Sequence, residues 1–525
     1  MIEARFQPDE WKIIETRFEP EKCRDSESIF ALGNGTMGQR ANFEEKYSGD
    51  SLQGTYVAGV YYPDKTVVGW WKNGYPEYFA KVPNAPSWIG IDVTVDGEQL
   101  DLARCHISSF RRILNMKEGL LTRSFITKMP SGATIEVNAR RFLSMSEPET
   151  AAISYAIRIT GGRGIIELTP YVTADVHNED ANYGEKFWED ESAEKFGLGA
   201  AVVARTRKTA FCVATAMHNH FSVNGRRVND NEEMNLRNDY AGCTFRHNYS
   251  DGDIIEVRKY VAVLSSLNHP EEGIAGKAIE RASAAAMEGF EAMLGRHIDA
   301  WNRKWEHGDI VISGDIAAQQ GIRYNIFQLN QTYTGEDPRL NIGPKGFTGE
   351  KYGGSTYWNT EAFAFPFYLS TSDTHVARNL LLYRYKQLDR AIENAGKLGF
   401  SGGAALYPMV TMNGEECHNE WEITFEEIHR NGAIAYAVFN YVRHTGDNDY
   451  LADYGLDVLI AISRFWAQRC NWSEEKKKYV ILGVTGPNEY ENNVNNNWYT
   501  NILASWTLKY TLGCLEKLQH ENPVK

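Results

Sequence analysis

The sequence predicts a multidomain β + α protein in which a large antiparallel β-sandwich is followed by a helical linker and a helical domain. At 525 residues the chain is too long for a single hydrophobic core, so two or three domains are expected. Apolar residues alternate with polar ones in the first half, and near residue 270 the pattern changes to helical spacing. We therefore expect the sandwich over residues 1–266, the linker over 267–314 and the helical domain over 315–525.

The strands of the sandwich are indicated by short stretches with the period of a half-buried strand. Ala133 to Ala139 and Ile153 to Ile159 both alternate apolar and polar side chains. Asp96-Gly97 and Asn224-Gly225 each follow a strand-like stretch, and these dipeptides supply the positive φ angles of a type I′ hairpin turn. Many short strands joined by such turns favour an antiparallel sandwich.

The linker shows one apolar stripe at helical spacing. The stripe consists of Ile279, Ala282, Ala286, Phe290, Leu294, Ile298, Trp301 and Trp305. Residues three and four positions apart share one face of a helix, so this face of a long helical segment is expected to pack against a core. Pro270, followed by two glutamates, is typical of a helix start, and a short apolar piece over 309–314 is expected to end the linker.

Further segments with the same spacing predict the helices of the last domain. They are marked by Ile322 to Tyr333, Val376 to Ile392, Ile434 to Val442, Val458 to Trp466 and Ile502 to Tyr510. Ser372-Asp373 suits the N-terminal cap of the second of these helices. The loops between the helices are long and rich in Gly, aromatic residues and carboxylates, and long loops on a rigid scaffold commonly carry function.

Composition and charge narrow the class of function. The net charge of −14 argues against a nucleic-acid partner, because no basic excess is present to neutralise phosphates. No apolar run is long enough to span a bilayer, and the first residues lack the apolar core of a signal peptide. The seven cysteines are scattered without metal-ligand spacing, so we expect reduced thiols in a cytoplasmic protein. The sequence contains no Gly-rich phosphate loop of the Walker or Rossmann type and no G-x-S-x-G elbow.

Three loops of the helical domain combine aromatic side chains with carboxylates and amides. They are 343–361, with Trp358, Asn359 and Glu361; 407–430, which is rich in glutamate; and 485–501, with Glu489, Glu491 and a run of asparagines. Aromatic faces stack on the C–H side of a sugar ring, while amides and carboxylates hydrogen-bond its hydroxyl groups. We interpret the three loops as one sugar site at one end of a helical barrel.

Blander interpretations of the same residues stay open at this stage. The asparagine run can be a polar surface turn, the glutamates a solvated acidic face, and Trp358 and Trp421 core residues. Glu416, His418 and Glu420 could instead ligate a metal ion, but their spacing matches no fixed ligand pattern. The recurrence of one composition in three loops favours the sugar site.

Glu489 is the first candidate for a catalytic acid, and Glu491 is the second. Cleavage of a glycosidic bond usually uses two carboxyl groups, one as acid and one as base or nucleophile. Phosphorolysis needs only one, because phosphate replaces the activated water and a single acid protonates the leaving oxygen. Burial of Glu489 among Tyr490, Trp498 and Glu491 is expected to raise its pKa, so that it keeps its proton near neutral pH.

Several of these stretches resemble glycoside hydrolase family 65. The matching stretches are Gly353 to Glu361, His418 to Gly432 and Thr485 to Glu491, together with Ala31 to Gly38 and Leu52 to Tyr61 in the first domain. The resemblance covers essentially the whole chain, and the motifs look most like those of members that act on maltose. It implies an N-terminal super-β-sandwich joined by helices to an (α/α)6 barrel, in a homodimer.

The resemblance also implies an activity and roles for particular residues. Such members convert maltose, an α-glucosyl disaccharide, and inorganic phosphate to glucose and β-glucose 1-phosphate with inversion, and they use no cofactor beside the phosphate co-substrate. Glu489 matches the general acid, and Trp358 and Asn359 match the pair that holds the glucosyl unit, although many relatives have Asp in place of Asn359. The loop that shapes the acceptor-sugar subsite in the family matches a loop that contains Glu416, His418 and Glu420 here.

The length of the helical domain departs from this pattern. Helices of about 11–12 residues and long loops leave room for about half of the barrel helices between residues 315 and 525, which implies an incomplete (α/α)6 barrel. The matching phosphate-binding loops would then lie beyond residue 525, either in a longer product or in the lost part of a truncated gene. A half barrel exposes apolar helix faces, so we expect low stability or association of the isolated chain.

Other functions are kept as alternatives. A trehalose or kojibiose phosphorylase would share the fold and the acid. An α,α-trehalase-like hydrolase would need a second carboxylate to activate water, for which Glu361 or Glu491 is available. A truncated, inactive sugar-binding protein would bind maltose without turning it over.

Overall fold

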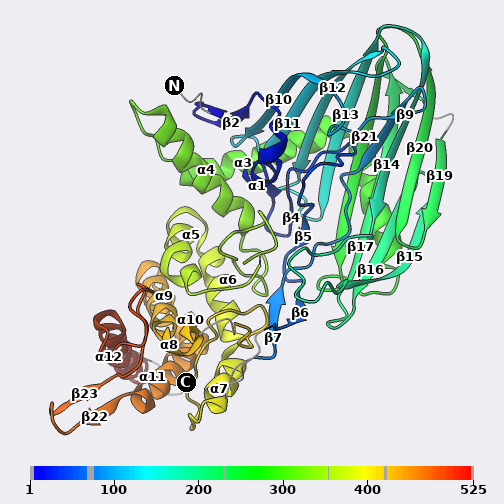
Figure 1. Cartoon of the computed structure of the whole chain (residues 1–525). Coiled ribbons are helices and arrows are strands. Elements are labelled where there is room, and N and C mark those ends of the chain that lie inside the picture. Colours follow the sequence, from blue (N-terminus) through cyan, green and yellow to red (C-terminus); the bar gives the residue numbers. More distant parts are fainter. Residues whose placement is uncertain (1–4, 68–75, 229–231, 353, 419–421, 522–525) are drawn as a thin grey trace. The chain divides into compact units, whose positions relative to one another are not determined.

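The computed structural model describes residues 5–67, 76–228, 232–352, 354–418 and 422–521 (Figure 1). Their contacts divide the chain into two compact units. The first unit comprises residues 1–62, 82–333 and 345–353, and the second comprises 63–81, 334–344 and 354–525. A β-rich first part and a helical last part confirm the predicted multidomain β + α class, while the domain boundaries at 266 and 314 stay a prediction.

The first unit is built on two antiparallel β-sheets (Figure 1). The larger sheet has the order β1 (Phe6–Gln7), β2 (Lys12–Glu15), β10 (Ile107–Asn115), β11 (Leu120–Lys128), β12 (Thr134–Leu143), β13 (Thr150–Thr160), β21 (Ile254–Ser265), β17 (Cys212–Val223), β16 (Gly199–Thr206) and β15 (Trp188–Phe196), with β18 (Arg226–Val228) paired to β17. The smaller sheet has the order β19 (Glu232–Arg237), β20 (Tyr240–Tyr249), β14 (Gly164–Thr173), β8 (Ile91–Val95) and β9 (Glu98–Gln99).

The two sheets pack face to face through aromatic and polar contacts. Phe221 of β17 stacks on Phe245 of β20 with ring centroids 4.7 Å apart. The buried Lys259 of β21 donates hydrogen bonds across the sandwich to the carbonyl oxygens of Gly90, at 3.0 Å, and Tyr171, at 2.5 Å. A lysine this deep is tolerated because its side-chain nitrogen is hydrogen-bonded, and burial lowers its pKa well below the usual value.

Both predicted hairpin turns are confirmed. Asp96 and Gly97 have φ angles of 53° and 82°, and the strands β8 and β9 that they join are paired. Asn224 and Gly225 have φ angles of 51° and 76° and join β17 to β18. The alternating stretches near residues 135 and 155 lie in β12 and β13, as their period of two predicts.

Helices α2 (Ile274–Glu288) and α3 (Phe290–Gly308) cover the outer face of the larger sheet. The prediction of one long helical segment is wrong here, because the chain breaks at Gly289, whose φ of 89° and ψ of 155° lie outside the helical region. The cluster under α2 consists of Ala201, Val203, Cys212, Ala214, Ala216, Ala262, Leu264, Ile274, Ala275, Ala278, Ile279 and Ala282. Its many alanines let the helix approach the strands closely, so the sheet is buried on both faces.

Smaller elements complete the first unit. They are a 3₁₀ turn (Pro20–Lys22), α1 (Cys23–Ile29), the sheet formed by β3 (Leu32–Gly33), β4 (Met37–Gln39) and β5 (Thr55–Val57), and α4 (Ile316–Thr332). The segment over 309–314 forms no strand. The α4 helix confirms the predicted segment up to Tyr333, and the side chain of Asp315 caps it by accepting a hydrogen bond from the amide of Ala318 at 2.9 Å.

The second unit is mainly helical (Figure 1). Its elements are β6 (Tyr62–Lys65), β7 (Tyr78–Lys81), α5 (Phe365–Thr371), α6 (Thr374–Tyr385), α7 (Leu388–Lys397), α8 (Ile423–Glu426), α9 (His429–Thr445), α10 (Asn448–Tyr450), α11 (Leu456–Arg469), β22 (Asn471–Ser473), β23 (Lys478–Val480) and α12 (Trp498–Glu521). Single π-helical turns at Thr360–Ala364 and Leu451–Gly455 lead into α5 and α11. The segment predicted as one helix from Val376 to Ile392 is two helices, α6 and α7, and Asp373 makes no side-chain cap.

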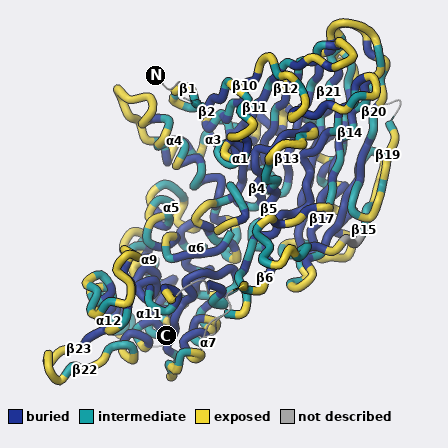
Figure 2. Tube along the Cα trace, in the orientation of Figure 1, coloured by how far each residue is buried: buried dark blue, intermediate teal, exposed yellow. Residues whose placement is uncertain are grey.

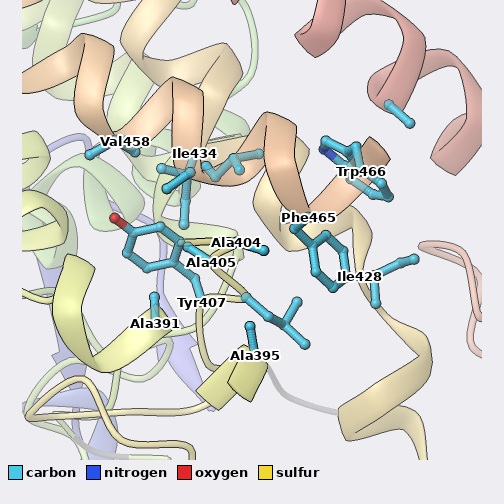
Figure 3. Packing of buried hydrophobic residues seen from close by; sticks show 14 of the residues in the cluster. Ala391, Ala395, Ala404, Ala405, Tyr407, Ile428, Ile434, Val458, Phe465 and Trp466 are labelled. Carbon is cyan, nitrogen blue, oxygen red and sulfur yellow. The ribbon is translucent and has the colours of Figure 1, made fainter. Parts of the chain in front are cut away.

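One hydrophobic cluster holds α7, α9 and α11 together (Figure 3). Its buried members include Ala391, Ala395, Tyr407, Ile428, Ile434, Val458, Phe465 and Trp466. Tyr407 and Ile428 come from the long loop between α7 and α9, so this loop is tied to the helices by burial as well as by hydrogen bonds. Figure 2 shows the contrast with the hairpin of β22 and β23, where most residues are exposed.

No helix of the described residues is both long and apolar enough to cross a membrane. No disulfide bond joins any of the seven cysteines, all of which lie in the described residues, and five of them are buried.

A buried network of ion pairs lies inside the first unit. Arg123 of β11 contacts Glu44 and Glu45, each at 2.6 Å, and Arg141 of β12 contacts Glu44 at 3.0 Å. The hydroxyl group of Tyr155 donates to Glu45 at 2.6 Å. Because these charges are removed from water, each carboxylate depends on its arginine partners.

Replacing Arg123 by methionine is expected to destabilise the first unit by about 3–5 kcal/mol, because Glu44 and Glu45 lose a partner while they stay buried. Arg246→Met is the matched control, since Arg246 pairs with Glu167 at an exposed position and should cost no more than about 1 kcal/mol. Thermal melts of the two variants against the parent protein measure the difference. Equal melting midpoints for the two variants would contradict a structural role of the network.

Candidate active site

The buried guanidinium group of Arg430, in the first turn of α9, organises the loop before this helix. Its Nε donates to the carbonyl oxygen of Tyr407 at 2.6 Å, and its Nη1 donates to those of Thr424 at 2.7 Å and Glu427 at 3.1 Å. Its Nη2 lies 3.6 Å from the carboxylate of Glu416. One side chain therefore ties together three separate parts of the loop.

Glu416 and His418 are both predicted to lie near the acceptor sugar. Their side chains hydrogen-bond within this loop and so shape it. The carboxylate of Glu416 accepts hydrogen bonds from the amides of Met409, at 2.6 Å, and Val410 and His418, both at 3.2 Å. Burial raises the pKa of Glu416, and the charge of Arg430 acts in the opposite direction. His418 is buried with its Nδ1 2.6 Å from the hydroxyl of Thr424, and burial lowers its pKa to about 4.

Glu420, the third residue of that prediction, lies outside the described residues, as does Trp421. Within the described part of the chain, no group of three or more His, Cys, Asp or Glu side chains is placed to hold a metal ion. Both carboxylate oxygens of Glu416 already accept backbone hydrogen bonds.

Trp358, Asn359 and Glu361 lie just before and inside the π-helical turn that leads into α5. Trp358 is half-buried and Asn359 is exposed, so both can meet a ligand. Glu361 is buried in a two-point ion pair with Arg384 of α6, with Nε to Oε1 at 2.6 Å and Nη2 to Oε2 at 3.1 Å. A carboxylate held in this way is poorly placed to activate water, which disfavours Glu361 as the second carboxylate of a hydrolase.

The loop that carries Glu489 is anchored by Glu426, the last residue of α8. The carboxylate of Glu426 accepts hydrogen bonds from the hydroxyl of Thr485 at 2.6 Å and the amide of Asn493 at 2.9 Å. The backbone carbonyl oxygen of Glu426 accepts a hydrogen bond from the amide of Thr485 at 3.1 Å. The two ends of the loop are also joined by a short antiparallel bridge between Val484 and Val494. Glu426 thus closes the base of the Glu489 loop.

The expected burial of Glu489 among its neighbours is wrong. Glu489 and Glu491 are exposed, and Tyr490 and Trp498 are 99% and 75% exposed. Asn493 has a φ of 50°, a left-handed turn that asparagine tolerates and that brings the chain back to Glu426. The anchors lie at the base of the loop, so the side chains at its tip face outward.

Sequence reasoning missed two buried side chains where α8 ends and α9 begins, Glu427 and His429. Glu427 is close enough to Glu489 for the two carboxyl groups to interact electrostatically, and its Oε1 lies 3.9 Å from the Nε2 of His429. The ring of His429 meets Trp358 edge to face at 4.7 Å and Tyr499 at 5.6 Å. Both residues belong to the motif from His418 to Gly432, but the spacing of residues in a loop does not reveal which carboxylates are buried.

The two missed side chains are both neutral near pH 7. Burial, reinforced by the charge of Glu489 and opposed by that of Arg430, raises the pKa of Glu427 to about 8. Burial and the charge of Arg430 lower the pKa of His429 to about 3. Glu427 is therefore protonated below about pH 8 and His429 is an uncharged imidazole, so the contact between them is not an ion pair.

These contacts bring four of the predicted or newly found groups together. Trp358 meets His429, His429 lies beside Glu427, and Glu427 interacts with Glu489. Aromatic rings, neutral hydrogen-bonding groups and the exposed carboxyl group of Glu489 suit the binding and protonation of a sugar.

Replacing Glu426 by alanine is expected to loosen the Glu489 loop, because Thr485 and Asn493 lose a charged acceptor worth about 1.5–3 kcal/mol. The amides of residues 485–493 should then exchange with deuterium about tenfold faster or more. Glu422→Ala is the matched control, since Glu422 is exposed in the same segment. Unchanged exchange in the Glu426 variant would show that the loop is held by other contacts.

Comparison with known proteins places both parts of the chain in one family. Residues 13–304 match the model described as glycosyl hydrolase family 65, N-terminal domain, and residues 323–524 match the family's central catalytic domain. Maltose phosphorylase of Bacillus subtilis (strain 168) is 51% identical over 99% of this chain and 68% of its own length. Alpha,alpha-trehalose phosphorylase of Thermoanaerobacter brockii is 33% identical over 98% of this chain and 67% of its own length.

The fold is also similar to that of a solved structure. A protein from the human microbiome, named as a candidate kojibiose phosphorylase, superposes with a TM-score of 0.89 at 28% identity, and the match covers 97% of this chain and 66% of the other. The chain thus spans about two thirds of the length of these relatives. With both domain models matched and a relative at 51% identity, the chain belongs to glycosyl hydrolase family 65.

Proposed function

We propose that this protein phosphorolyses maltose with inversion, giving glucose and β-glucose 1-phosphate. The observation that carries the proposal is the 51% identity, over 99% of the chain, to the maltose phosphorylase of Bacillus subtilis (strain 168). Identity to the trehalose phosphorylase of Thermoanaerobacter brockii is 33%, and to the kojibiose phosphorylase of the same organism 29%, which favours maltose over the other two disaccharides.

Glu489 acts in this reaction as the general acid. Its carboxyl group gives a proton to the glycosidic oxygen as the bond from that oxygen to C1 breaks, so glucose leaves with the proton. A phosphate oxygen attacks C1 from the opposite face and forms the new C–O bond, which inverts the α-linkage to β-glucose 1-phosphate. Glu489 regains a proton from water after the products leave.

The other predicted residues hold the sugar rings. The half-buried Trp358 offers a face to the glucosyl unit, and the exposed Asn359 hydrogen-bonds its hydroxyl groups. Glu416, His418 and Glu420 belong to the loop at the acceptor sugar. Because the carboxylate of Glu416 accepts hydrogen bonds from three backbone amides, the role of Glu416 is to shape this loop.

The proposal also covers the barrel fold, the oligomeric state, the cellular location and the cofactor requirement of the enzyme. The helices of the second unit form the first part of an (α/α)6 barrel. The protein works as a homodimer in the cytoplasm and needs no cofactor beside inorganic phosphate.

Glucose 1-phosphate is expected to form from maltose only when inorganic phosphate is present, because phosphate is the nucleophile. The measurement is an enzymatic assay of glucose and glucose 1-phosphate, with maltose, trehalose and kojibiose as parallel substrates. Equal glucose release with and without phosphate would identify a hydrolase. Binding of maltose by calorimetry without any turnover would identify a sugar-binding protein.

Glu489→Gln is expected to lower kcat by about 10²–10⁴-fold while it leaves the affinity for maltose largely unchanged, because glutamine cannot donate a proton to the leaving oxygen. Glu491→Gln is the matched control, since Glu491 is exposed in the same loop and should keep most of the activity. Steady-state kinetics of both variants decide between the two carboxyl groups. The opposite ranking would make Glu491 the acid.

A further inference from the structure

Two buried polar side chains, Glu427 and His429, have no role in the reaction as described so far. Glu427 is 1% exposed and His429 is 0% exposed. Within the described part of the chain, neither carboxyl oxygen of Glu427 and neither ring nitrogen of His429 has a hydrogen-bond partner. A buried polar group without a partner costs free energy, so a cluster of four such atoms calls for a ligand that satisfies them.

Their neighbours indicate which ligand this is. His429 contacts the ring of Trp358 at 4.7 Å and that of Tyr499 at 5.6 Å, and Glu427 interacts with Glu489. The gap of 3.9 Å between Glu427 Oε1 and His429 Nε2 is too long for a direct hydrogen bond. A hydroxyl group that donates to one and accepts from the other can bridge such a gap.

The backbone holds these two side chains in place. Ile428, the residue between them, is buried in the hydrophobic cluster shared by α7, α9 and α11 (Figure 3). The carbonyl oxygen of Glu427 is bound by Arg430 at 3.1 Å. Because the apolar side chain of Ile428 packs in the core, its two polar neighbours have little freedom to turn, and His429 stays against Trp358.

We propose that Glu427 and His429 form the floor of the glucosyl pocket, where their unpaired polar atoms hydrogen-bond the hydroxyl groups of the sugar. The inference rests on the proposed function and adds two sugar-binding residues to it. A protonated carboxyl group and a neutral imidazole each donate and accept, which matches the hydroxyl groups of glucose.

The charges around Glu427 support its protonated state. Burial and the charge of Glu489 raise its pKa to about 8, and Arg430 opposes this shift. Arg430 is itself shared with the carboxylate of Glu416, and the carboxylate of the adjacent Glu426 is bound by Thr485 and Asn493. A neutral Glu427 also adds no negative charge to the site, which a phosphate anion has to approach.

This arrangement predicts how sugar binding depends on pH. Below about pH 8 Glu427 keeps its proton and can donate it in a hydrogen bond. As the pH rises through 8 the carboxyl group of Glu427 ionises and loses the proton that it donates in this hydrogen bond. Only about one molecule in ten is still protonated one pH unit above the pKa, so the dissociation constant for maltose should rise about tenfold by pH 9.

The test is calorimetry of maltose binding in phosphate-free buffer at pH 6.5 and 9.0, with the parent protein, Glu427→Gln, Glu427→Ala and, as control, the exposed Glu422→Gln. Glutamine preserves the neutral donor and acceptor, so Glu427→Gln is expected to bind maltose within about threefold of the parent at pH 6.5 and to lose the weakening at pH 9.0. Alanine removes both the hydrogen-bond donor and the acceptor, so Glu427→Ala should weaken maltose binding about tenfold or more. The control should behave as the parent at both pH values.

Two binding results would contradict the proposal. Parent-like binding by Glu427→Ala would overturn the floor assignment, and Glu427→Gln as weak as Glu427→Ala would overturn the protonated state. If Glu427→Ala fails to fold, as judged by circular dichroism, the pH dependence of Glu427→Gln still decides. Because binding is measured without phosphate, failure of the phosphorolysis assay would refute the proposed function alone.

Discussion

The candidate site depends on one buried cation, the guanidinium group of Arg430. An arginine keeps its charge when it is buried, so it must be surrounded by acceptors. Here the acceptors are three carbonyl oxygens from distant parts of one loop and the carboxylate of Glu416. Asn431 adds to this by binding the backbone of Tyr407 and Ala405. The described part of this long, irregular loop is thereby fixed to the helices that it joins.

The segment from Glu426 to Arg430 divides its side chains between the core and the site. Ile428 enters the hydrophobic cluster, Arg430 ties the loop, and Glu426 holds the base of the Glu489 loop. Among the described residues, the side-chain polar atoms of Glu427 and His429 are buried without hydrogen-bond partners. Such a departure from the rule that buried polar groups are paired is expected where a ligand supplies the missing partners.

Two carboxyl groups close together cannot both carry a charge at little cost, and the structure separates them by environment. Glu489 stands at the exposed tip of its loop, whereas Glu427 is buried below it. Burial therefore acts on Glu427 and raises its pKa to about 8, so this group keeps its proton near neutral pH. An attacking phosphate anion meets less repulsion in such a site than it would between two carboxylates.

The local sequence pattern was sufficient to predict many of the strands, turns and helices. Alternation and hairpin dipeptides located β12, β13 and the turns at Asp96 and Asn224, and helical spacing located α4, α9, α11 and α12, because these signals come from neighbours in the chain. The breaks at Gly289 and between α6 and α7 were missed, since apolar spacing continues across them. The loops of the sugar site were recognised by composition. Composition did not reveal the roles of Glu427, His429 and Arg430 or the exposure of Glu489. Burial and hydrogen-bond partners depend on contacts between residues far apart in the chain.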